Sequence, residues 1–92
     1  MKLMLVGSWE RTTFAEIGSR FGRGEDVEPE GATILSRWHD PSSRMFWVVV
    51  ETDDAAAVQR WTLAWSDDVD WETYVVMDDA ETGAILQDEL GL

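Results

Sequence analysis

The sequence predicts a small α+β domain in which strands and helices follow in the order β-α-β-β-α-β, with a short extra helix at the C-terminal end. Three observations support this prediction. The segment 32–52 has two runs rich in β-branched and aromatic residues around a polar turn that contains Pro41, as in a β-hairpin. Its second run, 45–50, contains no polar residue, which is typical of a strand covered on both faces. Apolar residues at helical spacing occur both before and after this hairpin.

The N-terminal part of the chain begins with a short apolar run, 2–9, which predicts a buried strand. The segment 13–16 has the Thr and Glu of a capping box and predicts the start of a helix. Three apolar residues follow at helical spacing: Phe14, Ile17 and Phe21. Gly24 is expected to end this helix, and a charged loop then leads to the hairpin.

After the hairpin, an aspartate at 53 or 54 is expected to cap a second helix that ends near 66–68. The apolar stripe of this helix is Val58, Trp61 and Trp65. The run 71–77 predicts the fourth strand. The aspartates at 78–79 should then cap a short tail helix that runs through 80–86 and ends before Gly91.

This order of elements is the split β-α-β, or ferredoxin-like, arrangement, which has a four-stranded antiparallel sheet with two helices on one face. In this topology the first and third strands lie in the middle, and these are the two runs without apolar–polar alternation. Two helices can cover only one face of the sheet, yet 45–50 is apolar on both faces. We therefore expect a second copy of the chain to cover the other face in a symmetric homodimer.

The register of the hairpin decides which side chains share a face of the sheet. With a turn at 40–43, His39 should lie opposite Arg44, and Arg37 opposite Phe46. Two sets alternate along the second strand: Met45, Trp47 and Val49, and Phe46, Val48 and Val50. The first set is the more uniformly apolar, so we expect it to meet the helices. The second set, which shares its face with Arg37 and His39, should then face the partner subunit.

The composition describes one acidic domain, 1–92, and excludes several classes of function. Of the 92 residues, 45% are hydrophobic, and the formal net charge is −12. All seven Lys and Arg residues lie in 1–60, whereas 61–92 has nine acidic residues and no basic one. Nucleic acids and anionic membranes attract clustered positive charge, so we expect neither as a partner. The chain has no cysteine and no apolar stretch of membrane-spanning length, and we expect a cytoplasmic protein.

Several segments resemble one family of short bacterial proteins that is known only as a domain of unknown function. They are Arg37-Trp38-His39, the run 51–57, Arg60-Trp61, Trp65-Ser66-Asp67 and Val69-Asp70-Trp71-Glu72. The resemblance covers about 2–84, although members of the family more often have Phe at the position of Trp71. It implies a fold of the dimeric α/β-barrel superfamily and a homodimer, and it implies no reaction.

The candidate functional residues centre on His39, the only histidine and the only side chain expected to titrate near neutral pH. Together with Arg37 and Arg44, it could bind an anionic ligand or act as an acid or base at the mouth of an apolar cavity. The alternative is a half-exposed histidine bonded to Asp40 or to a backbone carbonyl.

Six tryptophans in so small a domain also suggest a pocket. Trp61 and Trp65 fit the core. The pocket candidates are the tryptophans on strands or at their ends: Trp9, Trp38, Trp47 and Trp71.

We expect no metal and no cofactor. A single histidine and no cysteine leave only oxygen ligands, and the acidic segment 67–72 lacks the spacing and the glycine of a calcium loop. Two functions stay open. The first is a homodimer that binds a small molecule or has a structural or regulatory role. The second is a cofactor-free oxygenase- or isomerase-like enzyme that uses His39 in a Trp-lined cavity. An enclosed cavity reached by His39 would favour the enzyme, whereas a filled barrel would favour the binding or structural role.

Overall fold

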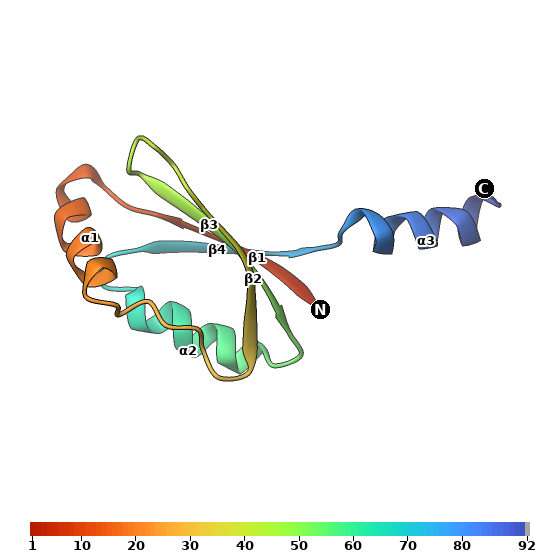
Figure 1. The fold of residues 1–92 in the computed structure, drawn as a ribbon, viewed down its shortest axis with the longest axis horizontal. Coiled ribbons are helices and arrows are strands. Elements are labelled where there is room, and N and C mark those ends of the chain that lie inside the picture. Colours follow the sequence, from red (N-terminus) through yellow and green to blue (C-terminus); the bar gives the residue numbers. More distant parts are fainter. Residues whose placement is uncertain (92) are drawn as a thin grey trace.

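The computed structural model describes residues 1–91 and has the expected ferredoxin-like α+β fold (Figure 1). The elements are strand β1 (Lys2–Ser8), a 3-10 turn η1 (Arg11–Thr13), helix α1 (Phe14–Gly22), strands β2 (Ala32–His39) and β3 (Met45–Thr52), helix α2 (Ala55–Trp65), strand β4 (Asp70–Val76) and helix α3 (Asp79–Leu90). The strands form one antiparallel sheet in the order β2-β3-β1-β4. The first and third strands therefore lie in the middle, as the sequence predicts.

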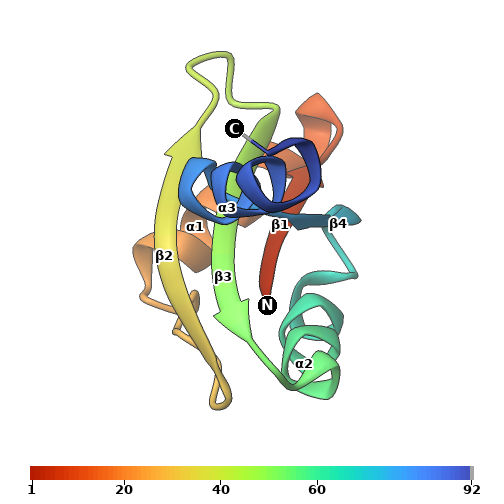
Figure 2. The ribbon, with the colours of Figure 1, turned by 90° about the vertical axis from the view of Figure 1, so that its right-hand side faces the viewer.

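The sheet has one covered face and one open face. Helices α1 and α2 lie on the same side of the sheet, and α3 extends away from it at the end opposite α1 (Figures 1 and 2). The buried apolar residues form one core between the two layers: Leu3, Leu5, Ile17, Ala32, Val48, Val50, Ala57, Val58, Trp61, Trp65 and Val69. Trp61 and Trp65 belong to this core, as expected from their helical spacing. No residue of α3 is buried.

The helix caps follow the sequence in two of three cases. The Asp54 carboxylate accepts a hydrogen bond from the Ala56 backbone N–H (3.0 Å), and Asp78 forms a capping box with Glu81. The capping box predicted at Thr13 is wrong, because η1 precedes α1 and leaves Thr13 in helical backbone geometry (φ −93°, ψ −13°). A capping side chain needs an extended backbone at that position. Helix α3 includes the expected segment 80–86 and ends at Leu90, before Gly91 as expected.

The hairpin register differs from the prediction. His39 lies opposite Phe46 and Arg37 opposite Val48, so the pairing is shifted by two residues along β3 from the predicted one. The backbone N–H of Asp40 donates to the Met45 carbonyl (3.2 Å), which closes the loop. Within this loop Ser43 has the left-handed φ of 61°, a backbone conformation that is uncommon for a residue other than glycine.

The assignment of the two sheet faces was also wrong. Val48 and Val50 are completely buried against the helices, and Phe46 packs on the same core. Arg37 lies on that same face, and Asp26 neutralises its charge at the rim of the sheet. A set of side chains that includes a charged residue can therefore face the helices. The open face has six central apolar side chains in register across three strands: Met4, Val6, Trp38, Met45, Trp47 and Val49.

Candidate ligand-binding pocket

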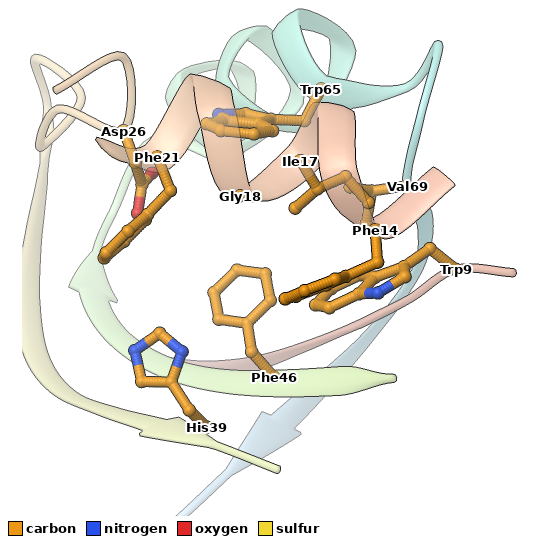
Figure 3. A pocket seen from close by; sticks show the side chains of 10 residues that line it. All are labelled: Trp9, Phe14, Ile17, Gly18, Phe21, Asp26, His39, Phe46, Trp65 and Val69. Carbon is orange, nitrogen blue, oxygen red and sulfur yellow. The ribbon is translucent and has the colours of Figure 1, made fainter. Parts of the chain in front are cut away.

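A pocket of about 210 Å³ lies between helix α1 and the sheet (Figure 3). We call it the α1 pocket. Its wall is formed by Trp9, Phe14, Ile17, Gly18, Phe21, Asp26, His39, Phe46, Trp65 and Val69. Phe14 and Phe21 come from α1, Phe46 from β3 and Trp65 from α2, so aromatic rings reach the pocket from both layers. Only His39 and Asp26 have ionisable side chains there.

Gly18 explains why there is room beside α1. It lies one helical turn after Phe14, on the helix face that looks at the sheet (Figure 3). A Cβ atom at this position would meet only the far end of the Phe14 ring, at 3.9 Å. The missing side chain leaves a space that Phe14 and Phe21 border from the two ends of the helix. The sequence signal for this space is a glycine within the stripe formed by Phe14, Ile17 and Phe21.

His39 lies at the mouth of the α1 pocket, at the end of β2. Its ring is 5.6 Å from the Phe21 ring, edge to face, and 6.1 Å from Phe46, nearly parallel to it. Within residues 1–91 neither ring nitrogen hydrogen-bonds to a protein group. A hydrogen bond from His39 to Asp40, one of the alternatives that the sequence left open, is not formed; the Asp40 carboxylate accepts from the Ser42 backbone N–H (2.9 Å). A bound molecule could therefore exchange a hydrogen bond with His39.

Asp26 and Arg37 form an ion pair beside the α1 pocket. The Arg37 guanidinium is 2.8 Å from the Asp26 carboxylate, whose side chain is only 6% exposed. The Trp61 indole N–H donates to the same carboxylate (3.1 Å). Removing one member of such a pair would leave a buried charge without a partner, which is strongly destabilising. Arg37 is therefore a structural residue here rather than a free ligand-binding arginine.

Arg20 of helix α1 holds this helix against α2 behind the pocket. Its guanidinium lies 4.1 Å from the centre of the Trp65 ring, donates to the Ala64 carbonyl (2.8 Å) and pairs with Asp68 (3.1 Å). Burial alone would lower the pKa of Arg20, but its hydrogen bonds to Glu25 and Asp68 more than compensate and raise it. The rear wall of the α1 pocket is thereby held in place by a permanent cation.

A second hollow lies next to the α1 pocket and is lined by Arg11, Phe14, Ser42, Ser43 and Arg44. We call it the arginine hollow; its volume is about 330 Å³. Phe14 lines both spaces. The Trp9 indole N–H also donates to the Ser43 carbonyl (2.8 Å), which ties a wall of the α1 pocket to the turn that carries Arg44.

The structure thus separates the seven residues that the sequence proposed as a site, of which Trp71 packs against the core. Trp9 and His39 line the α1 pocket, and Arg44 lines the arginine hollow. Arg37 is paired with Asp26. Trp38 and Trp47 lie opposite each other on the open face of the sheet, away from the α1 pocket. The predicted cluster of His39, Arg37 and Arg44 is therefore not formed.

Two further observations limit the chemistry of the described part of the chain. Among residues 1–91, no group of three or more His, Asp or Glu side chains could hold a metal ion. No helix in this range is long and apolar enough to cross a membrane.

The fold and the α1 pocket define a small ferredoxin-like α+β protein with an aromatic pocket between its helical layer and its sheet. The sequence model of one family, the domain of unknown function DUF3303, matches residues 1–90. The chain belongs to this family, and the resemblance seen in the sequence is confirmed.

Solved structures share the fold at low sequence identity. MtbAldR superposes with a TM-score of 0.59 and 10% identity over 85% of this chain, which spans only 52% of MtbAldR. A protein of Pseudomonas aeruginosa gives a TM-score of 0.50 with 14% identity over 84% of this chain and 95% of its own length. A proposed antibiotic biosynthesis monooxygenase from Deinococcus radiodurans gives a TM-score of 0.47 with 14% identity. The match covers 85% of this chain and 94% of that protein. The first two similarities show the fold alone. No curated protein matches the chain.

Proposed function

We propose that this protein is a homodimer that binds a small, single-ring molecule in the α1 pocket. The observation that carries the proposal is a pocket of about 210 Å³ walled almost entirely by aromatic and aliphatic side chains. A dry apolar cavity of about 150 Å³ in another protein is large enough for benzene. The α1 pocket therefore has room for one substituted ring, and its open mouth gives that ring a way in.

The dimer part of the proposal is supported by the open face of the sheet. Its central residues are apolar, and Trp38 leaves 66% of its surface exposed in a single chain. A contiguous apolar patch on a sheet is typical of an interface between proteins. Because the patch belongs to every copy, two copies can cover it through a two-fold axis. The α1 pocket lies on the other side of the sheet and would stay open in such a dimer.

Ligand binding can be tested by titrating p-cresol and indole into the protein and following the backbone amides by NMR, together with the indole N–H signals of Trp9 and Trp65. We expect saturable shifts for residues of the α1 pocket. Native mass spectrometry of the freshly purified protein would show whether a molecule is already bound.

A pair of variants makes this test specific. Gly18→Leu should fill the α1 pocket and abolish p-cresol binding, because only the Phe14 ring stands near the new side chain. Gly22→Leu is the matched control, since it is the same change on the same helix, with no atom within 4 Å of its Cβ and no place in the pocket wall. Equal binding by the two variants, or no binding of either compound to the wild type, would contradict the proposal.

A second candidate function is acid–base chemistry by His39 on the bound molecule. It is favoured by the ring of His39 at the pocket mouth, with no protein group bonded to its nitrogens within residues 1–91. A general base must come within hydrogen-bond distance of its substrate. NMR titration of the His39 ring with and without saturating p-cresol tests this contact. An unchanged titration would remove the candidate and leave a binding role.

A further inference from the structure

We infer that the molecule bound in the α1 pocket is an aromatic carboxylate, whose ring enters the pocket and whose charged group lies in the arginine hollow between Arg11 and Arg44. This inference rests on the proposed ligand-binding function and names the class of its ligand.

The first support is the distribution of ion pairs. Of the seven basic side chains, five are paired with acidic groups in the structure: Lys2, Arg20, Arg23, Arg37 and Arg60. Within residues 1–91, Arg11 and Arg44 form no ion pair, although the chain has 19 acidic residues to offer. Both line the same hollow. Two guanidinium groups without an acidic partner therefore line one space, which makes it suitable for an anion.

The second support is the donor chemistry of the arginine hollow. Besides the two arginines it is lined by Ser42, Ser43 and Phe14, and no acidic side chain takes part. Guanidinium groups match the two oxygens of a carboxylate with parallel hydrogen bonds, and serine hydroxyls add further donors. An anionic group in the hollow would therefore meet donors and no repelling carboxylate.

The third support is that Arg44 sits on an ordered turn rather than on a loose loop. The Trp9 backbone N–H donates to the Arg44 carbonyl (3.2 Å), and the Trp9 indole donates to the Ser43 carbonyl (2.8 Å). The Ser43 N–H donates to the Asp40 carbonyl (2.9 Å). Ser43 keeps a left-handed backbone (φ 61°), which is unfavourable for a residue with a side chain. The fold thus fixes the backbone that carries Arg44 relative to the wall of the α1 pocket.

The last step joins the two spaces. Phe14 forms part of both walls, so a molecule that packs on this ring can place an apolar end in the α1 pocket and a polar end in the arginine hollow. A ring that carries a carboxylate has this shape. A neutral ring would leave both arginines without a partner.

The experiment compares 4-methylbenzoate with p-cresol, which has a similar ring and no charge at neutral pH. We expect 4-methylbenzoate to bind at least about tenfold more tightly, because its hydrogen bonds are charge-assisted. Its affinity should also fall as salt is added, since both arginines are exposed. Arg11→Gln and Arg44→Gln should each remove most of this preference and leave p-cresol binding unchanged. Arg60→Gln, an exposed arginine paired with Asp54 outside both spaces, is the charge-matched control.

The possible results separate the inference from the proposed function. If p-cresol binds and 4-methylbenzoate binds no better, the inference fails and the proposed function stands. If neither binds, both fail. If 4-methylbenzoate binds through the arginines but Gly18→Leu has no effect on it, the hollow is an anion site without the ring pocket, and the inference is overturned. It is also overturned if the arginine variants change the oligomeric state and leave ligand binding intact.

Discussion

Gly7 shows how a single residue shapes the floor of the α1 pocket. It is the next-to-last residue of β1, and a Cβ atom there would come within 2.7 Å of the Phe46 ring and 3.0 Å of Val69. The Phe46 ring occupies the space that a side chain at position 7 would take. In the sequence Gly7 is only a glycine within an apolar run. Its role in making room for Phe46 cannot be inferred without knowing that Phe46 lies opposite it in the sheet.

Gly7→Ala should therefore lower the free energy of unfolding by about 1–3 kcal/mol, because Phe46 and Val69 must move. Chemical denaturation checks this, and p-cresol binding should weaken in the same variant. Gly83→Ala is the matched control, as no atom lies within 4 Å of its Cβ and alanine favours a helix. A Gly7→Ala protein as stable as the wild type would show that the Phe46 ring is free to move.

At the scale of elements, the sequence predicts the strands and helices well, because their apolar periodicity and polar breaks are local properties. The register of the β2–β3 hairpin was predicted wrongly, because it depends on the left-handed backbone of Ser43. A serine in the sequence gives no signal for this conformation. The position of Arg44 in the site was predicted wrongly for the same reason, since the register of the hairpin decides where the Arg44 side chain lies. Arg11 and Asp26 come close to the pocket only through the tertiary fold, and no local pattern marks them.

Helix α3 depends on its cap more than the other helices do, since none of its side chains is buried. Isolated helices of about 12 residues are marginal in water. Asp78→Ala should lower the free energy of unfolding of helix α3 by about 1 kcal/mol and leave the rest of the fold intact. We expect faster amide exchange over 79–90 with unchanged exchange in the sheet. Asp78→Asn, which retains a capping acceptor, should restore the wild-type rates. Sheet amides that also exchange faster would mean that α3 supports the core.

The loop after α1 gives a pH-dependent contribution to stability. The hydrogen bonds from Arg23 and then Arg20 lower the pKa of Glu25 from its ordinary value of 4.5. Because the lowered pKa belongs to the folded state, the stabilisation is complete above pH 4.5 and is lost as the pH falls through the folded pKa. The wild type should thus be more stable than Glu25→Gln at neutral pH, and this difference should vanish in acid. A difference that does not change with pH would contradict this assignment.

At the scale of the whole molecule, the choice between the two faces of the sheet could not be made from residue types. Both sets of side chains along β3 are apolar. Two other features decide which set faces the helices: Gly7 leaves room for the Phe46 ring, and Asp26 forms an ion pair with Arg37. The topology, in contrast, follows from the order of the elements. The two helices had to lie on one face, whichever face that was.

The proposed dimer can be tested by placing a lysine on each face in turn. Val49→Lys puts a charge on the open face and should yield a folded monomer, since an unpaired charge in an interface costs several kcal/mol. Val48→Lys is the neighbouring control, and because Val48 is fully buried in the core it should prevent folding. Multi-angle light scattering and circular dichroism on the same samples distinguish the two. A Val49→Lys protein that remains a dimer would exclude the open face as the interface.

The projecting helix α3 has a consequence for how the size of this protein is measured. The Cα radius of gyration is 15.6 Å and the long axis 52 Å, whereas a compact chain of this length has a radius of gyration of about 12 Å. An elongated particle diffuses more slowly than a sphere of equal mass. A monomer would therefore leave a gel-filtration column early and be mistaken for a larger species when compared with globular standards. The ratio of frictional coefficients from sedimentation velocity, rather than an elution volume, separates an extended single chain from a compact pair.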